Sequence, residues 1–415
     1  MAGRSHLHQR FERDVRRGDH ATVAATGDRV ADELATAGHD DLIPEVLVQI
    51  GAAHAALDRY ESAAGYLTQG LVMQAELAPA LPEPPRPSAP PATAATAPPP
   101  PRQPAPANPA APFGAPPGAT GRQAMFAAPP APGLPSAPRA DGAGPQTTAM
   151  RRATRAANRL DWYELTLLDV ELRLGRYDDV VARVPRLTDP THHAEVRFAA
   201  TRAHAAVLGI QGQFEGAHHL LNTAGGLAAR IRSRFRMALV EGDRAVLLAH
   251  QGRILEAITA ADRVLAPMIR PAVGEYQYWS NAAGAAVALS VSRAAASSGD
   301  HLTAQRMLLL GTNAAQRVGG SYLAAHVDLA RGVFWFLERD LDDAEAALVS
   351  AGRQFGVLGC APAVALATLE QGRLAQARGL VQSARPLYQR AFDDFRRLGQ
   401  AREVNEIGRL LVGLG

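Results

Sequence analysis

The chain contains no lysine, and all 43 of its basic residues are arginine. This absence excludes mechanisms that need a lysine amine, such as a P-loop lysine, a pyridoxal-phosphate Schiff base or a lysine general base. The single cysteine, Cys360, excludes an internal disulfide and a zinc site built from several thiolates. A reducing cytoplasm fits this cysteine content, and the lysine-free, alanine- and arginine-rich composition suggests a GC-rich bacterial genome.

Aromatic residues are also scarce, at 5% of the chain, although hydrophobic residues make up 47%. Alanine and leucine dominate the apolar residues, which favours small, closely packed helices. No segment reaches the roughly 18 apolar residues of a membrane span, and the N-terminus lacks the apolar run of a signal peptide. We therefore expect a cytoplasmic protein without membrane insertion.

Proline is concentrated in one region, because 23 of the 30 prolines fall between Pro79 and Pro145. Such a segment has few backbone donors and little apolar side-chain area, so burial cannot offset the entropy of ordering it. The sequence therefore predicts a disordered Pro/Ala-rich linker at residues 79–149. It would join a small N-terminal module of helical hairpins, residues 1–78, to a larger helical array, residues 150–415.

One short signature recurs on both sides of this linker: Gly, any residue, a large apolar residue, two spacers, and Ala or Val. We interpret each copy as the turn of a helical hairpin, where glycine ends the first helix and the small residue lets the second helix approach. After the linker, successive copies start roughly 33 to 47 residues apart, which is the scale of one hairpin with its loop. The copies start at Gly18, Asp58, Gly175, Gly212, Gly252, Gly299, Arg339 and Gly372.

The end of the chain predicts a closing pair of helices with Gly399 at the turn. Such a pair would act as C-terminal capping helices, because the last unit of a stacked array otherwise exposes its apolar face.

The pattern resembles the tetratricopeptide repeat, a unit of about 34 residues with small side chains at its eighth, twentieth and twenty-seventh positions. The clearest units here surround Tyr60 and Leu341, whereas the unit around Tyr177 has larger residues at all three positions. The matching small residues are Gly51, Ala63 and Gly70 in the first unit, and Gly332, Ala344 and Ala351 in the second.

This resemblance implies an all-α fold of antiparallel helical hairpins stacked in a right-handed superhelical solenoid. Because the observed period is longer than about 34 residues, we expect extended helices or loops. A related helical-hairpin array remains the alternative.

The resemblance also implies a binding site, since the first helices of such units line a concave groove that receives a partner protein or peptide. The family often recognises extended peptides or acidic C-termini through basic residues, which makes Arg173, Arg202 and Arg293 candidates by position. The predicted partner-binding residues are Trp162, Asp169, Arg173, Arg202, Asp243, His250, Arg293, His326 and Phe336.

Residues with catalytic or metal-binding character are present but are not arranged as a site. His192 and His193 are adjacent, as are His218 and His219, so their side chains would point about 100° apart on a helix, whereas ligands on one face need a spacing of three or four. The sequence has no HExxH, GxSxG or GxGxxG motif and no EF-hand loop. We therefore predict no catalytic, cofactor or metal site, and a protein that is not an enzyme.

Two arginine-rich segments, residues 151–159 and 230–236, could bind phosphates or an acidic partner. We interpret the second as a helix with arginines around most of its circumference. The net charge is only +3 and no nucleic-acid-binding motif occurs, so nucleic acid is not expected as a partner. The aromatic residues at 276–279 are expected near the start of a helix, as packing residues.

The leading hypothesis is a non-enzymatic scaffold or adaptor that binds a protein or peptide in the concave groove of the array. The alternative is a regulatory sensor, in which the array binds a small ligand or signalling peptide and controls a transcription or signalling partner. The sequence leaves open the identity of the partner and whether the protein forms a homo-oligomer.

Overall fold

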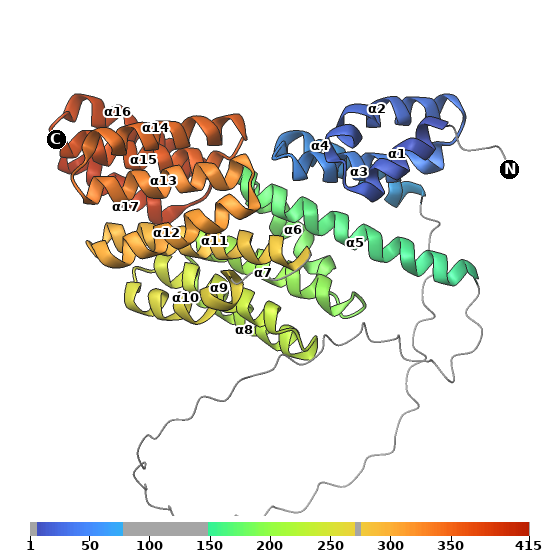
Figure 1. Cartoon of the computed structure of the whole chain (residues 1–415), viewed down its shortest axis with the longest axis horizontal. Helices are drawn as coiled ribbons and strands as arrows, with labels where there is room; N and C mark the ends of the chain where they lie inside the picture. The colour runs from blue at the N-terminus through green and yellow to red at the C-terminus, as the bar shows by residue number, and fades with distance from the viewer. Residues whose placement is uncertain (1–5, 78–147, 270–274, 415) are drawn as a thin grey trace, which may run out of the picture. The chain divides into compact units, whose positions relative to one another are not determined.

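A computed structural model describes the backbone of residues 6–77, 148–269 and 275–414, and the side chains of 6–75, 161–265 and 281–414. Throughout these residues every regular element is a helix, and consecutive helices pack as antiparallel hairpins (Figure 1). The predicted all-α repeat of helical hairpins is confirmed. The predicted linker falls outside the described residues, apart from the start of α5, and the division of the chain into three parts stays a prediction. No helix in the described part is long and apolar enough to cross a membrane.

The N-terminal residues form two hairpins and one short 3-10 helix. Their shared core contains Phe11 of the first helix, Val30 and Leu34 of the second and Ile50 of the third, all at most 1% exposed. The elements are α1 (His6–Arg17), α2 (His20–Thr36), η1 (Asp40–Leu42), α3 (Ile43–Ala56) and α4 (Tyr60–Leu77).

Residues 148–414 form six further hairpins and a last single helix. The hairpins are α5 (Thr148–Leu174) with α6 (Tyr177–Leu187), α7 (Ala194–Ile210) with α8 (Phe214–Arg230), α9 (Arg234–His250) with α10 (Ile254–Ile269), α11 (Glu275–Ser297) with α12 (His301–Val318), α13 (Ser321–Leu337) with α14 (Leu341–Val357), and α15 (Ala361–Ala377) with α16 (Val381–Arg397); the last helix is α17 (Ala401–Gly413).

Most turns between these helices contain one residue with positive φ, usually glycine. In several turns the amide after this residue bonds back to the carbonyl five residues earlier, as Gln213 does to Leu208 at 2.8 Å. This is the Schellman pattern, which satisfies the last carbonyls of a helix while it reverses the chain. From the end of α12 onward a positive-φ residue recurs at a constant interval, at Gly319, Arg339, Gly359, Gly379 and Gly399, and Gly320 beside the first of these also has positive φ.

Regular helix length explains the long period. The helices α13 to α16 each have 17 residues, and a short turn completes each unit. Two such units make one hairpin, which is therefore longer than the tetratricopeptide unit of about 34 residues. Seven of the eight predicted turns are confirmed, as are the two closing helices with Gly399 between them.

The predicted turn at Gly372 is wrong, because this glycine lies inside α15 and the chain turns at Gly379, where φ is +74°. The signature matched because Gly372 occupies the small position of a first helix, seven residues before the turn. Gly51 and Gly332 stand seven residues before their own turns at Asp58 and Arg339. At each of the three, a Cβ would lie within 3 Å of a side chain of the next helix.

The predicted continuous helix over residues 230–236 is also wrong. Helix α8 ends at Arg230, α9 starts at Arg234, and Arg232 between them has a φ of 56°. The Ser233 hydroxyl caps α9 by accepting the Arg236 amide at 3.2 Å. Helix propensity hid this turn because arginine stands where the equivalent turns have glycine.

The hairpins on both sides of the linker pack into one compact unit. One buried cluster includes Tyr60 and Leu67 of α4, Leu167 and Leu174 of α5, and Phe355 of α14. A second contact joins distant parts of residues 148–414. Gln400, in the turn before α17, donates to the hydroxyl of Tyr177, the first residue of α6, at 3.1 Å. The first and last hairpins after the linker are thus in direct contact.

Substitution of Gly372 by alanine should destabilise the protein. The new Cβ would lie 2.8 Å from two ring atoms of Tyr388, which is fully buried and cannot move aside. We expect the free energy of unfolding in urea to fall by about 1 to 3 kcal/mol. Gly226→Ala is the matched control, because this glycine lies within α8 with no atom near the added methyl group, and there we expect a gain of up to about 1 kcal/mol. Equal effects of the two substitutions would contradict the close-approach role.

Candidate partner-binding site

The first helices of successive hairpins bring several predicted residues together as ion pairs. Arg202 of α7 binds Asp243 of α9, with Nη2 2.8 Å from Oδ1, and the guanidinium lies 5.5 Å from the centre of the Phe198 ring. Both side chains are about one-quarter to one-third exposed. This pair ties neighbouring hairpins together, so Arg202 already has a carboxylate partner.

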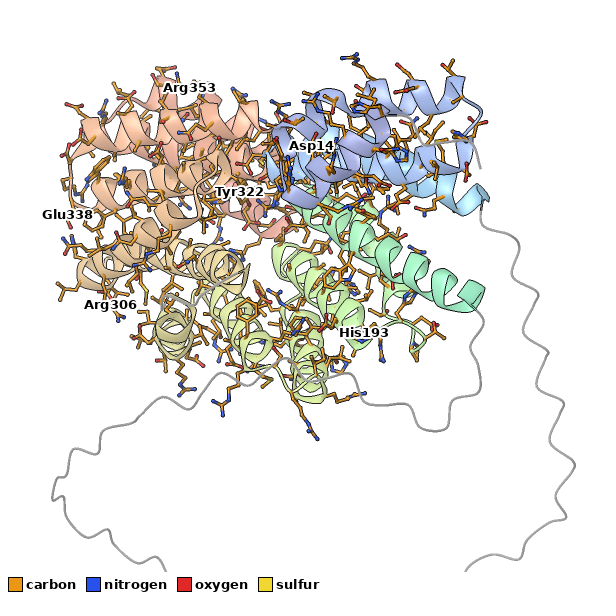
Figure 2. All side chains as sticks on the ribbon, turned by 45° about the vertical axis from the view of Figure 1, so that its right-hand side comes forward. Asp14, His193, Arg306, Tyr322, Glu338 and Arg353 are labelled. Carbon is orange, nitrogen blue, oxygen red and sulfur yellow. The ribbon has the colours of Figure 1, made fainter. Side chains whose placement is uncertain are left out.

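Arg173, at the end of α5, is held by several groups. It donates to Asp169 at 2.9 Å and to the Tyr60 hydroxyl at 2.8 Å, and its guanidinium lies 4.2 Å from the centre of the Tyr322 ring. Tyr60 in turn donates to Asp58 at 2.6 Å. Figure 2 shows Tyr322 inside the fold, whereas Arg306, Glu338 and Arg353 lie at its margins in that view. Arg173 is therefore fully engaged within the protein.

His326 of α13 lies between two aromatic rings. Its centroid is 4.6 Å from that of Tyr322 and 4.8 Å from that of Phe355, both in edge-on geometry. Burial, followed by the charges of Arg293 and Arg173, lowers the pKa of His326 to about 3. The ring is therefore neutral at physiological pH and packs between the two aromatic rings.

Arg293 of α11 differs from the other predicted arginines because no described residue pairs with its guanidinium. Its Nη1 is buried without a hydrogen-bond partner. Burial lowers the pKa of Arg293, and the negative charge of Glu370 opposes this shift. Glu370 itself binds Arg373 at 2.6 Å. The site therefore contains a cation whose hydrogen-bonding capacity is not filled by the residues that the structure describes.

His250, at the end of α9, lies close to this cation. Burial, followed by the charges of Arg293 and Arg402, lowers the pKa of His250 to about 4. The side chain nevertheless keeps some solvent-accessible surface, as do those of Arg293 and His326.

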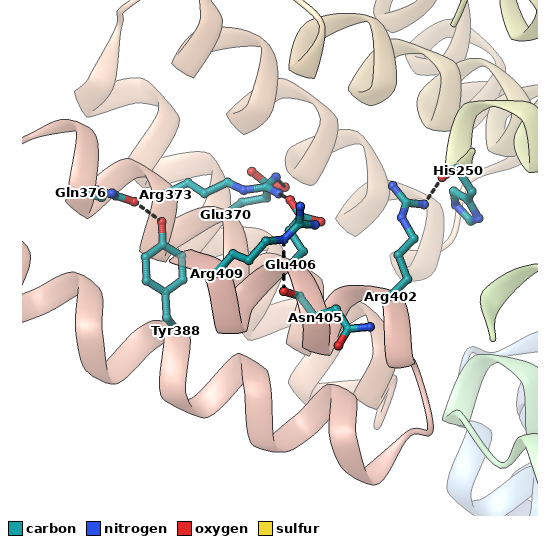
Figure 3. A network of polar contacts seen from close by, with 9 residues as sticks. All are labelled: His250, Glu370, Arg373, Gln376, Tyr388, Arg402, Asn405, Glu406 and Arg409. Atoms are coloured by element: carbon teal, nitrogen blue, oxygen red, sulfur yellow. Dashed lines mark hydrogen bonds and ion pairs between the residues drawn. The ribbon is translucent and has the colours of Figure 1, made fainter. Parts of the chain in front are cut away.

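A polar network from α15 and α17 lies next to His250 (Figure 3). Arg373 binds both Glu370 and Glu406, and thereby ties α15 to α17. Arg402 of α17 donates to the backbone carbonyl of His250. These contacts connect the last helix to the third hairpin after the linker, which sequence spacing alone does not reveal.

Two predicted residues lie apart from this group. Trp162 is 53% exposed and lines a small pocket with Asp161, His193 and Glu195, between α5 and the start of α7. Phe336 packs against the buried cluster that contains Phe355. The structure therefore brings the other seven predicted residues into one group. Within it the charge of Arg293 acts on both His250 and His326. Arg173 binds Asp169, and Arg202 binds Asp243.

The histidines and arginines that the sequence offered as metal or phosphate ligands mostly contact other residues of the protein or lie exposed. His192 contacts Asp161 at 3.1 Å, and His193 caps α7. No group of three or more potential metal ligands occurs among the described residues.

In the arginine-rich turn, Arg230, Arg232 and Arg234 are exposed, and Arg236 binds Glu195 at 2.8 Å. Helix α11 starts at Glu275 as expected, but its aromatic side chains and those of the arginines at 151–159 fall outside the described residues.

Sequence reasoning missed Tyr322, Asp58 and Tyr60 as members of the site. Tyr322 is the second residue of α13, one helical turn before the predicted His326, so the same face of the helix could have suggested it. For Asp58 and Tyr60 the sequence predicted a turn between two helices and no role in binding. Their contact with α5 and α13 depends on how distant hairpins meet.

Stability should depend on pH through His326. In the unfolded chain its pKa is near 6.5, whereas in the folded protein it is about 3, so protons bind the unfolded state preferentially between these values. The stability is therefore complete above pH 6.5 and falls as the pH drops towards 3. We expect His326→Phe to flatten the dependence of the unfolding free energy on pH by up to about 1 kcal/mol per unit between pH 6 and 4. A comparison at pH 8, where both states are neutral, gives the packing difference alone, and parallel curves below pH 6 would contradict the assignment.

Comparison with known proteins leaves the classification at the level of the fold. No family model matches the chain, and no curated protein matches its sequence. One similar solved structure is described as a Rap protein complexed with competence and sporulation factor; the TM-score is 0.49 at 11% identity, over 62% of this chain and 73% of that chain. The chain has a helical-repeat fold, and this statement rests on its own hairpins.

Proposed function

We propose that the protein is a non-enzymatic interaction scaffold of the tetratricopeptide type, which binds a segment of another protein along the inward side of its first helices. The observation that carries the proposal is Arg293, whose buried Nη1 has no partner among the described residues. We assign to Arg293 the recognition of a carboxylate, either a C-terminus or an acidic side chain of the partner.

Carboxylate binding follows from the chemistry of this guanidinium. A buried cation without hydrogen-bond partners is costly, and a carboxylate can accept two parallel bonds from arginine in a geometry that lysine cannot reproduce. Burial lowers the pKa of Arg293, which means that its surroundings disfavour the charge until an anion arrives. The neutral rings of His326 and His250 nearby add hydrogen-bonding groups without adding positive charge.

A protein segment fits the site better than a nucleic acid. Several phosphates would need several free cations, but Arg173, Arg202 and Arg373 are already bound to carboxylates. The predicted residues are distributed over α5, α7, α9, α11 and α13, and neighbouring packed helices lie about 8 to 10 Å apart. A ligand that reaches several of them must be extended, as a peptide segment is.

Arg293→Ala should remove most of the affinity for such a segment. The probe is a random dodecapeptide library, panned on the full-length protein, followed by fluorescence anisotropy of the enriched peptides with the wild type and with the Arg293→Ala variant. We expect enrichment of peptides with a carboxylate at one fixed position, and a loss of about tenfold to a hundredfold in affinity on substitution.

Arg353→Ala is the matched control, because this arginine is exposed and lies at the margin of the fold (Figure 2). It should leave the affinity unchanged, and Arg293→Lys should restore only part of it. Peptides that bind the wild type and Arg293→Ala equally well would sink the assignment.

A further inference from the structure

The turn between α3 and α4 has an unusual residue at its positive-φ position. Equivalent turns have glycine there, at Gly18, Gly38, Gly175, Gly212 and Gly252, among others, whereas this turn has Asp58 with a φ of 57°. The left-handed conformation costs a non-glycine residue of the order of 1 kcal/mol. Arg232 and Arg339 occupy such positions too, and Asp58 differs from them in the contacts that its carboxylate makes.

Asp58 reaches across to the start of α13. Its Oδ2 accepts the backbone amide of Ser321 at 2.7 Å and that of Tyr322 at 3.2 Å. The residue that precedes α13 is Gly320, which has no side chain to cap the helix. A residue from a distant hairpin of the chain thus supplies the capping carboxylate, where the helix dipole favours negative charge.

Two glycines, Gly320 and Gly359, leave room for Asp58 and Glu61 to approach the array. A Cβ on Gly320 would lie 3.0 Å from Oδ2 of Asp58, and a Cβ on Gly359 would lie 3.3 Å from Cγ of Glu61. Glu61 also binds Arg176 at the start of α6. Tyr60 is only 2% exposed, and its hydroxyl lies between Asp58 and Arg173. Asp58, Tyr60 and Glu61, which we name the tip, thus meet complementary groups of the array, with Tyr60 buried at the centre and Glu61 at the exposed edge.

We propose that the tip is an internal ligand of the solenoid that competes with the partner segment for the part of the groove next to Arg173. The tip already occupies Arg173 and covers the ring of Tyr322, 5.8 Å away from that of Tyr60. The competition, but not the docking, rests on the proposed function.

The chain connection suits a reversible contact. Seventy residues separate the end of α4 from the start of α5, so an undocked tip stays tethered. Because the tip belongs to the same chain as its docking site, its docking is an intramolecular equilibrium. A partner segment must therefore overcome this equilibrium to reach Arg173.

Asp58→Gly tests the docking without harm to the turn, because glycine is the residue that equivalent turns already use. In the full-length protein, we expect hydrogen exchange of the Ser321 and Tyr322 amides to become roughly tenfold faster, and that of the α3–α4 turn to rise with it. Tyr60→Phe, which removes the hydroxyl between Asp58 and Arg173, should cause a smaller increase of the same kind. Unchanged exchange in α13 in Asp58→Gly would overturn the proposal.

Arg232→Gly is the matched control, since it makes the same kind of replacement at the positive-φ position of the α8–α9 turn. It should leave exchange in α13 unchanged. Light scattering should give the mass of one chain for the docked protein, and a dimer that dissociates in Asp58→Gly would overturn docking within one chain.

The peptides enriched on the wild type separate the two proposals. Asp58→Gly should increase their affinity several-fold, whereas Arg293→Ala should decrease it. If exchange shows undocking but the affinity does not rise, the tip docks without competing, and that part of the inference is wrong. A loss of docking that leaves the Arg293 effect intact would spare the proposed function.

Discussion

The arrangement depends on a reversal of the chain at regular intervals, made by one residue in the left-handed conformation. Where the interval is constant, as it is from Gly319 to Gly399, the helices α13 to α16 each have 17 residues. A helix of this length spans about 25 Å, so successive helices have matched lengths and stack without overhang. The small residue seven positions before the turn then faces the next helix, as Gly51, Gly332 and Gly372 do.

The sequence predicted this repeat well because the turn is a local event. Glycine with a large apolar residue two positions later marks the turns at Gly175, Gly212 and Gly252 without reference to any distant residue. The same short pattern wrongly placed a turn at Gly372, because the sequence does not distinguish a glycine needed for close helix packing from a glycine needed for positive φ. It missed the turn at Arg232, where the conformation occurs without glycine.

Contacts between distant hairpins could not be predicted in this way. Asp58 and Ser321 come from opposite sides of the linker, and Gln400 meets Tyr177 across most of the array. The site residues were predicted from their position on the first helices, and position on a helix does not specify the ion-pair partner of a residue. Arg202 forms an ion pair with Asp243 from another hairpin, whereas Nη1 of Arg293 has no hydrogen-bond partner among the described residues. The sequence around each arginine does not specify this difference.

A solenoid with uniform helices transmits changes of register along its whole length. If one residue were removed from within α13, every later side chain of that helix would rotate by about 100°, and the turn at Arg339 would point elsewhere. Insertions in this region are then compatible with the fold only as complete units. Insertions and deletions should be tolerated better where the helix length already departs from 17 residues, at the short helix α6 and in the loop that follows it up to His193. Length variation in this protein's lineage is thus expected to concentrate there, outside α11, the helix that holds Arg293.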